Sequence, residues 1–580
     1  MKYSFHRLRI GTLAASASIL LAVGCNGSNG DGVFFNNGNG GVVGSDGPTT
    51  SVAPVVHQVG NVASGKNVFR NETFGNEKFW TDAVRLPAGI VATGFTPVQA
   101  LKAGLSVDSD AFIAATNITQ ATKDAVLAEL KTDLSPANAP NLNNVNTTIA
   151  LINANAVIGI VPKDTNKDGV IDITKGDKTG ATCALCHTIT DASVFNLPSG
   201  GSIGKRLDGR ANHNLNFGAL LALGTNSRAA FPLLQLTLAA NGNQTLGRAP
   251  TGLTKNSTEP EVDAYLNNPA YYPVGMFDDT FDGNGDPNHN PALFRTDLAA
   301  PWGTEGAIAR LDNFSNLVYT GLLDPTGITT TAGRAFVRKL GGTAAGDEIV
   351  DSYIAVLAAT NVTGYPFVTA TSGVTAVSGV APTPGVVYSG TEEAPLGVRV
   401  DNQMLLDMNA YLNSLQAPPG VVADAAAGLR GRNLFRTSNC TTCHNVDQSK
   451  PVPAFVVAMK TIFPGDNPVT LLAQRDPPLN PILDTPGNIF DDKMAVVNAS
   501  IRGDIRGTAM PLLLDLARKP NFLHDSSVPS LDALLNPSRG ANAPHPFYFS
   551  DTAQRADMVE FLRELDTSTR TTITINTTSN

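Results

Sequence analysis

Apolar residues recur with a helical spacing in two segments that lie far apart in the chain. The spacing i, i+3, i+4, i+7 occurs once in Met408, Tyr411, Leu412 and Leu415 and again in Met558, Phe561, Leu562 and Leu565. Side chains with this spacing share one face of a helix. Two shorter segments, residues 65–70 (GKNVFR) and 431–436 (GRNLFR), also match and place a Gly and a Phe on one helical face. The pattern predicts four helices that form two equivalent pairs.

The repeated pairs divide the chain into two unequal halves. We place the first at residues 61–417 and the second at 424–568, joined by the sequence APPG, with a short tail at 569–580. The first half is much the longer. Its additional sequence includes a helix-like run at residues 121–130 and a Val/Thr/Ser/Gly-rich stretch at 369–384 that predicts a small hairpin.

The N-terminus has the pattern of a secretory signal. Basic residues precede an apolar run at residues 10–23, which is too short for a membrane span. The run ends in Ala-Val-Gly-Cys25, which resembles a bacterial lipobox, although Leu21 stands one place early; ordinary signal cleavage is the alternative. Residues 1–25 are therefore a lipoprotein signal with lipidation at Cys25, and residues 26–60, rich in Gly and Asn, form a flexible tether. Bacterial lipoproteins that stay in the inner membrane have an Asp directly after the lipidated Cys. This chain has Asn26 there, so we expect anchoring to the outer membrane.

Composition narrows the class of protein. Hydrophobic residues make up 42% of the chain, which is enough for substantial cores. The chain also has 54 glycines and 37 prolines, which indicate that much of it forms loops. The formal net charge of −9 opposes binding to a phosphate backbone, so nucleic acid is not an expected partner.

Four of the five cysteines stand in two short motifs. Each half contains one C-x-x-C-H sequence, Cys183-Ala-Leu-Cys186-His187 and Cys440-Thr-Thr-Cys443-His444. This spacing is the signature of covalent c-type haem attachment: two thiols reach the two vinyl groups, and the adjoining His is the proximal ligand of the iron. A zinc site built from both pairs would leave the histidines unexplained. Two covalent haems are expected, with His187 and His444 on the irons.

The helix pairs and motifs together resemble a known architecture. The first and last helix of each half look like those of a class I cytochrome c domain, so we expect a mostly α fold with two such domains, the first carrying large insertions. Residues 522–531 (FLHDSSVPSL) are similar to a segment of bacterial di-haem cytochrome c peroxidases and related haem rubber oxygenases, with Ser526 in place of the usual Gly.

The resemblance implies a distal ligand for the second iron only. His524 takes this role in the rubber-oxygenase pattern, and Met510, followed by Pro, is the alternative. In the first half the equivalent segment has Asp312 and no His or Met. His213, Met276 and His289 are the other candidates there. Otherwise the first iron has an open face.

Residues 164–172 (DTNKDGVID) resemble the first nine positions of an EF-hand calcium loop. Asp164, Asn166, Asp168 and Asp172 supply oxygen at positions 1, 3, 5 and 9, and Gly stands at position 6. Lys175 occupies position 12, where a bidentate Glu is usual; Asp177 is a substitute. Residues 282–286 (DGNGD) repeat the spacing more weakly. The di-haem peroxidases that this chain resembles also use a calcium ion near the haem interface.

These features predict an exported, lipid-anchored di-haem c-type cytochrome, a peroxidase-like oxidoreductase with one electron-transfer haem and one reactive haem. Peroxide or dioxygen is the expected substrate, and a redox protein or quinol-linked donor supplies electrons. The alternatives are a non-enzymatic electron carrier of the outer membrane and a haem oxygenase acting on an organic compound. No catalytic acid or base can be assigned; Glu259, Glu261 and Glu305 only lie in the right region.

Overall fold

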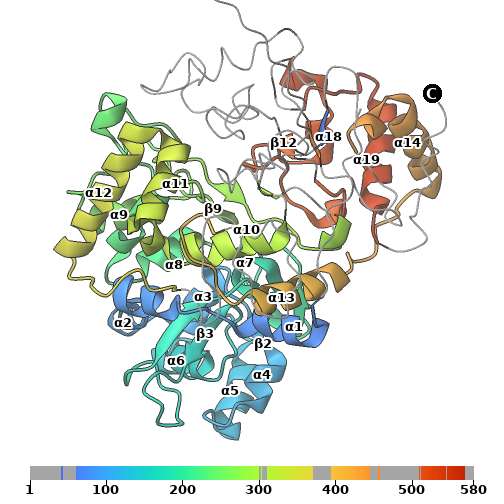
Figure 1. Ribbon diagram of the computed structural model, residues 1–580. Coiled ribbons are helices and arrows are strands. Elements are labelled where there is room, and N and C mark those ends of the chain that lie inside the picture. Colours follow the sequence, from blue (N-terminus) through green and yellow to red (C-terminus); the bar gives the residue numbers. More distant parts are fainter. Residues whose placement is uncertain are drawn as a thin grey trace, which may run out of the picture.

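The computed structural model describes residues 41–43, 60–298, 302–303, 308, 310–369, 394–444, 455–457, 465, 508–509, 511–541, 543 and 545–567. Cys25, Met510, the tail beyond residue 567, and all but residue 369 of the predicted hairpin lie outside this set, as does most of the tether. The described chain is mostly helical, as expected, with only short strands (Figure 1).

The helices and strands follow one another without a large sheet. The helices are α1 (Val62–Asn71), α2 (Leu86–Thr93), α3 (Pro97–Lys102), α4 (Ser109–Ala114), α5 (Gln120–Glu129), α6 (Val145–Asn153), α7 (Ala184–His187), α8 (Phe217–Ala222), α9 (Glu259–Leu266), α10 (Leu311–Leu317), α11 (Thr331–Gly341), α12 (Thr343–Ala359), α13 (Asn402–Ser414), α14 (Ala425–Thr437), α18 (Leu531–Leu534) and α19 (Thr552–Glu564). The strands are β1 (Gly41–Val43), β2 (Val107–Asp108), β3 (Ile160–Lys163), β4 (Lys178–Ala181), β5 (Thr188–Thr190), β6 (Phe195–Asn196), β7 (Ser202–Gly204), β8 (Arg206–Asp208), β9 (Met276–Phe277), β10 (Asn288–His289), β11 (Phe455–Val457) and β12 (Thr508–Ala509).

The short strands make several small sheets. Among the described residues, three are two-stranded antiparallel sheets, β3 with β4, β5 with β8 and β9 with β10, and a fourth has three strands, with β7 antiparallel to β6 and parallel to β2. A further three-stranded sheet has the order β1-β11-β12. In the β5–β8 pair, Thr188, the residue after the first C-x-x-C-H motif, stands opposite Asp208.

The four helices predicted from the apolar spacing are confirmed. Helix α1 packs on α13, and α14 packs on α19, so the two halves repeat the same contact (Figure 1). Equivalent aromatic pairs lie at the two contacts: Phe69 and Tyr411 have ring centroids 5.8 Å apart, and Phe435 and Phe561 have centroids 5.3 Å apart. The helix-like run at residues 121–130 also forms a helix, α5.

A glycine permits the close approach at each contact. A Cβ on Gly65 would lie 1.8 Å from the carbonyl oxygen of Asp407, and a Cβ on Gly431 would lie 2.0 Å from that of Asp557. Both distances are far shorter than any contact between non-bonded atoms. In the first half the carboxylate of Asp407 also accepts the Asn61 N–H, at 2.8 Å. Each helix pair can therefore close only with Gly at this position.

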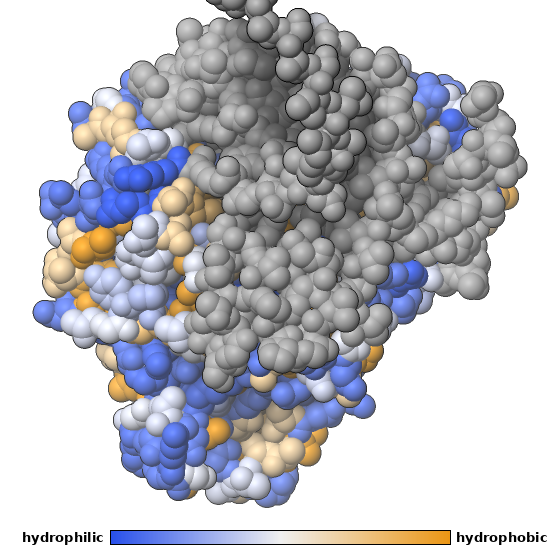
Figure 2. Space-filling model, in the orientation of Figure 1, coloured by the Kyte–Doolittle hydropathy of each residue, from blue (hydrophilic) through white to orange (hydrophobic). Residues whose placement is uncertain are grey.

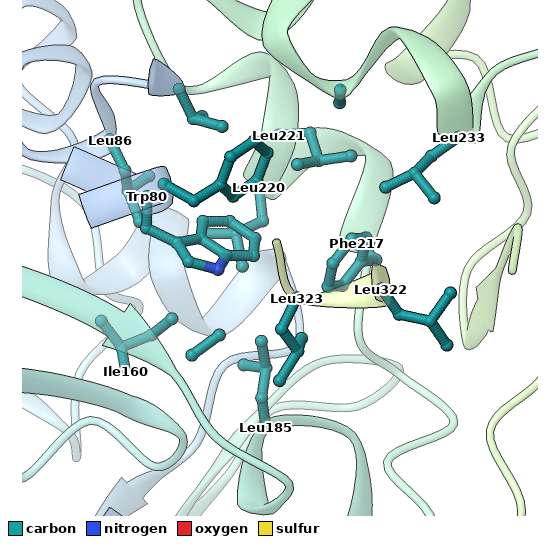
Figure 3. Close-up of a cluster of buried hydrophobic side chains, with 14 of the residues drawn as sticks. Trp80, Leu86, Ile160, Leu185, Phe217, Leu220, Leu221, Leu233, Leu322 and Leu323 are labelled. Atoms are coloured by element: carbon teal, nitrogen blue, oxygen red, sulfur yellow. The ribbon is translucent and has the colours of Figure 1, made fainter. Parts of the chain in front are cut away.

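Two separate hydrophobic clusters fill the halves. The larger is built from buried residues between 68 and 412, and the smaller from buried residues between 435 and 565. Figure 3 shows part of the larger cluster, to which Trp80, Phe217, Leu323 and Leu185 all belong. A small third cluster of Phe294, Ala417 and Leu514 joins the two halves.

The surface facing the viewer in Figure 2 is mixed in character. Polar residues cover most of its described part, with small apolar patches between them. No described helix is long and apolar enough to cross a bilayer.

We predict that Gly65→Ala destabilises the first half and Gly431→Ala the second. The added methyl group overlaps backbone that cannot move aside, and overpacking of this kind costs about 1–3 kcal/mol or more. Thermal unfolding measures the loss. Gly341→Ala in α11 is the control, because its new Cβ would have its nearest neighbour at 3.7 Å; Ala is the better helix former there. Unchanged melting of both variants would contradict the close-approach argument.

Candidate functional site

The first C-x-x-C-H motif is fixed to the interior by its apolar second position. The short helix α7 begins at Ala184, directly after Cys183, and its Leu185, the second residue between the two cysteines, is only 2% exposed within the cluster of Figure 3. Gly159, just before β3, lies so close that an added Cβ would be 2.2 Å from the Cα of Leu185. The Thr182 N–H donates to the Gly159 carbonyl at 3.0 Å. Backbone packing therefore sets the position of the motif before any cofactor is considered.

The two thiols of this motif are neutral and free. Burial raises the pKa of Cys183 to about 11 and that of Cys186 to about 12. The Cys183 Sγ lies 3.2 Å from the buried Tyr319 hydroxyl and 3.9 Å from the Met408 Sδ on α13. Neither thiol is in a disulfide, so both are available for thioether bonds.

One hydrogen bond orients the imidazole of His187. Its Nδ1 lies 2.8 Å from the carbonyl oxygen of Pro291. Since a carbonyl can only accept, Nδ1 carries the proton. Burial also lowers the pKa of His187 to about 4, so the ring is neutral and its Nε2 has a free lone pair. A neutral imidazole whose second nitrogen donates to a carbonyl is the arrangement that metal-ligating histidines use.

Asp208 ties the strand after the motif to the helix contact. Its carboxylate accepts from the Arg70 Nε on α1 at 2.6 Å and from the Tyr411 hydroxyl on α13 at 2.5 Å. Its side chain is only 2% exposed. The helix pair, β8 and the first motif are therefore one connected unit.

The second motif follows α14 directly. Asn439 adopts a left-handed conformation (φ 61°), the chain makes a 3-10 turn over Cys440–Thr442, and the His444 N–H donates to the Cys440 carbonyl at 3.0 Å. Burial raises the pKa of Cys440 to about 11 and also raises that of Cys443. The second thiol pair is therefore neutral as well.

His444 faces a second imidazole that the sequence analysis missed. Burial lowers the pKa of His444 to about 4, and the ring centroid of His545 lies 6.2 Å away. Burial, together with the charge of His444, lowers the pKa of His545 to about 3. Within the described part of the chain, the buried Nδ1 atoms of both rings have no hydrogen-bond partner.

The spacing of these two rings fits an iron between them. An imidazole nitrogen lies about 2 Å from a bound transition metal, so two axial imidazoles have ring centres roughly 6 Å apart. Only three histidines fall in the second half, His444, His524 and His545. The sequence alone leaves His524 and His545 as equal candidates by elimination, and no local motif distinguishes His545.

The structure places His524 at the contact between the two halves. Its carbonyl oxygen accepts the His289 N–H at 2.7 Å and lies 3.0 Å from the His289 Nδ1. Burial lowers the pKa of its ring. Ser526 has φ 57°, in the left-handed region, which explains why glycine is usual at this position of the segment. The rival ligand Met510 lies outside the described residues.

His289 is fully engaged and does not offer a nitrogen to an iron. Its Nδ1 donates to the His524 carbonyl, and its Nε2 lies 3.0 Å from the Lys519 Nζ, which donates to it. Met276 is only 1% exposed in β9. His213 stands beside the first motif, because the N–H of its neighbour Asn212 donates to the Cys186 carbonyl at 2.8 Å.

Asp312, the counterpart of His524 in the first half, belongs to a buried ion pair. Its Oδ2 lies 2.9 Å from the Arg310 Nη2 and 2.6 Å from the Arg399 Nη2. Burial works to raise the pKa of Asp312, but the two guanidinium groups outweigh it and hold that pKa below its usual value. This position of the first half therefore offers an ionised carboxylate locked to arginine and no imidazole.

The loop at residues 164–172 is held by hydrogen bonds between its own side chains and backbone. The Gly169 N–H donates to the Asp164 Oδ2 at 3.0 Å, and the Asp168 N–H donates to the Asn166 Oδ1 at 2.9 Å. Lys167 (φ 61°) and Gly169 (φ 83°) are both left-handed. The Asp164 and Asn166 side chains therefore accept hydrogen bonds from backbone N–H groups of the loop itself.

The closing end of this loop is less suited to a cation. The Lys175 Nζ lies 3.0 Å from the Asp172 Oδ2 and supplies a positive charge of its own. Asp177 accepts backbone N–H groups of Thr165, Asn166 and Asp172, so it braces the loop from outside. Among the residues that the structure describes, no three His, Cys, Asp or Glu side chains surround a ready-made metal position.

Comparisons with known proteins add little to this picture. No family model and no curated protein matches the chain. Among solved structures, a chain of Kuenenia stuttgartiensis hydrazine synthase, from a crystal pressurised with xenon, matches with a TM-score of 0.23 and 13% identity, covering 49% of this chain and 74% of that chain. A TM-score this low carries no argument about fold or function.

We predict that Lys519 makes the stability of the protein rise with alkaline pH. Burial lowers its pKa from 10.5 to about 8, so between these values the unfolded chain binds more protons than the folded one. Stability must then increase as the pH rises through this window, while below it the full cost of burying the ammonium applies. Urea midpoints across the window measure the slope. Lys519→Met should flatten it, and Lys255→Met, at an exposed lysine, should not. An equal slope in wild type and Lys519→Met would refute the assignment.

Proposed function

We propose that this protein is an exported di-haem c-type cytochrome of the peroxidase-like group, with one cytochrome c-like domain in each half. The support is a repeated unit: a Gly-mediated helix pair, a C-x-x-C-H motif with neutral thiols, and a neutral imidazole at its end. The donor sets fit a covalent haem, since thioether bonds need two thiols and the iron needs a neutral imidazole. When bound, the haem supplies an iron that carries an electron or reacts with peroxide or dioxygen.

The proposal assigns electron transfer to the second haem and reaction with the oxidant to the first. Its main support is a difference between the two halves. In the second half, His545 stands opposite His444 at a ring distance of 6.2 Å, which favours an iron closed on both faces. In the first half, His289 is occupied by Lys519 and by the His524 carbonyl, and Asp312 is held by two arginines. These contacts favour an open face on the first iron, where a small oxidant can bind.

The chain's own residues have defined tasks in this proposal. Pro291 keeps the proton of His187 on Nδ1, which leaves the Nε2 lone pair free; this nitrogen would hold the haem iron. The Tyr319 hydroxyl accepts a hydrogen bond from the Cys183 thiol at 3.2 Å and would lie beside the thioether once the haem is attached. The electron donor would be a redox protein or a quinol-linked carrier, and lipidation at Cys25 would hold the protein at the outer membrane. Calcium binding at residues 164–172 stays a prediction from the sequence.

We predict that replacing Cys183 and Cys186 with Ala removes one of the two covalent haems, because each half provides a complete attachment motif. Pyridine haemochrome stoichiometry against protein concentration measures the loss. The reciprocal variant, with Cys440 and Cys443 replaced, should lose the other haem and keep the first. Two haems remaining in either variant would sink the assignment of the motifs.

We predict that His545→Ala converts the second haem from low-spin to high-spin, because it removes an axial imidazole. The ferric spectrum reports the change. His524→Ala and Met510→Ala are the matched comparisons, since these residues are the ligands that the sequence resemblance favours. If only one of those two variants changes the spin state, His545 is not the ligand and the sequence-based choice takes its place.

Ligand binding to the wild-type protein distinguishes an enzyme from an electron carrier. We expect cyanide to bind to the first haem and to leave the second unchanged, because only the first iron has an open face. Titration followed in the ferric Soret band, with the Cys183/Cys186 variant as the control lacking that haem, measures it. Failure of cyanide to bind in both ferric and ferrous protein would favour the non-enzymatic electron carrier.

A further inference from the structure

A buried hydroxyl beside the first C-x-x-C-H motif has a single residue as its partner. Tyr319 is 0% exposed, and its hydroxyl lies 3.2 Å from the Cys183 Sγ. Within the described residues, Cys183 alone hydrogen-bonds to this hydroxyl. A thiol is a weak donor and a weak acceptor, and a Phe would fill the same space without burying an oxygen. The hydroxyl therefore adds little to stability, and its use must lie at the sulfur.

The backbone around Tyr319 departs from a regular helix. Helix α10 passes at Val318 into one π-helical turn, η5 (Val318–Leu322), in which the Leu323 N–H donates to the Val318 carbonyl at 2.9 Å. Such turns are rare in proteins and occur frequently at functional sites. Tyr319 is the second residue of this turn, and its hydroxyl reaches a motif that lies 136 residues earlier in the chain.

A strained aromatic residue packs on the same ring. Phe74 has φ 49°, in the left-handed region that a bulky side chain rarely adopts, and its ring lies edge-on to Tyr319 with centroids 4.6 Å apart. The Glu72 carboxylate accepts the N–H groups of Thr73 at 3.0 Å and of Phe74 at 2.8 Å, and so holds this turn. Strain of this kind persists only where the surrounding structure imposes it. The Tyr319 ring is therefore fixed beside the sulfur.

Haem attachment would reverse the hydrogen bond between these two groups. In the free chain the Cys183 thiol donates to the Tyr319 hydroxyl. Thioether formation adds the S–H across a vinyl group, so that sulfur bonds to one vinyl carbon and the hydrogen moves to the other. The sulfur then has lone pairs and no proton. Burial raises the pKa of Tyr319 well above its usual value, so the hydroxyl keeps its proton and is the side-chain group that can donate to the sulfur.

We propose that Tyr319 donates a hydrogen bond to the Cys183 thioether sulfur and thereby raises the reduction potential of the first haem. A hydrogen bond to the sulfur draws electron density away from the attached ring system, which favours the reduced form of the iron. Hydrogen bonding and burial around a haem are among the means by which a protein sets its potential. This inference rests on the proposed function, because it requires a haem at Cys183.

The second half offers the opposite kind of contact. Among the described residues, the Cys440 Sγ lies 4.0 Å from the Ser438 carbonyl oxygen, which can only accept. A thioether sulfur has no proton to give to this carbonyl, so the contact is lost once the cysteine is attached to a haem. The hydrogen bond from Tyr319 therefore acts on the first haem and contributes a difference in potential between two sites that share one framework.

The test measures both reduction potentials in the full-length haem protein. Tyr319→Phe removes only the hydroxyl. We expect it to lower the ferrous-to-ferric ratio of the first haem at a fixed potential by up to about tenfold, which is about 59 mV for one electron, and to leave the second haem unchanged. The variant with Cys440 and Cys443 replaced by Ala retains only the first haem and so assigns the two potentials.

Tyr353→Phe is the matched control. Tyr353 is also 0% exposed, and its hydroxyl donates to the Ala229 carbonyl at 2.8 Å. Its substitution removes a buried hydrogen bond and should lower the melting temperature without moving either potential. Equal potentials of the first haem in wild type and Tyr319→Phe, or an equal shift in both Phe variants, would overturn the inference.

A second substitution keeps the test decisive if Tyr319→Phe does not fold. Replacement of Tyr319 by 3-fluorotyrosine keeps the ring and makes the hydroxyl a stronger donor, so the potential of the first haem should rise. An unchanged or lower potential overturns the inference. Two covalent haems without these shifts leave the proposed function standing, whereas fewer than two in the wild type contradict the proposed function and this inference together.

Discussion

The organisation of this protein depends on backbone-to-backbone contact between the first and last helix of each half. At Gly65 and at Gly431 there is no room for even one methyl group, because a carbonyl oxygen of the partner helix occupies that space. Helices that touch this closely bring Phe69 onto Tyr411 and Phe435 onto Phe561. In the first half they also meet on Asp208, which continues to the strand that follows the C-x-x-C-H motif. The glycine therefore governs the geometry of a site that it does not touch.

The two halves share one framework and differ in the polar groups near their motifs. The second is small, and the ring centroids of its His545 and His444 lie 6.2 Å apart. The first has grown by insertion, and its polar groups near the equivalent positions are already paired, Asp312 with two arginines and His289 with Lys519. In a buried setting such pairing is costly to break, since separating either partner strands a charge or a polar atom. The first site is therefore resistant to recruiting an extra ligand from these residues.

Much of the framework could be read from the sequence, and the remainder depended on contacts between distant residues. The helix pairs were predictable because apolar periodicity and matching Gly-x-x-x-Phe segments are local signals. The motif residues were predictable because their spacing is fixed by the chemistry. The roles of Pro291 and Tyr319 were not, because a carbonyl or a hydroxyl 104 or 136 residues away from the motif carries no local pattern. His545 was not predictable because it stands in no recognisable motif, whereas His524 stands in the segment that resembles the di-haem peroxidases; only folding brings His545 to His444.

The buried state of the thiols has a consequence for the order of events during biogenesis. A thiol reacts as its thiolate, and burial raises the pKa of Cys183 to about 11 and that of Cys186 to about 12, so the folded chain holds almost none of the reactive form at neutral pH. An exposed thiol in an extended chain ionises far more readily. Any covalent modification of these cysteines is therefore favoured while the polypeptide is still unfolded, and closure of the helix pair afterwards buries the product. The rate of folding therefore limits the time during which these cysteines can be modified.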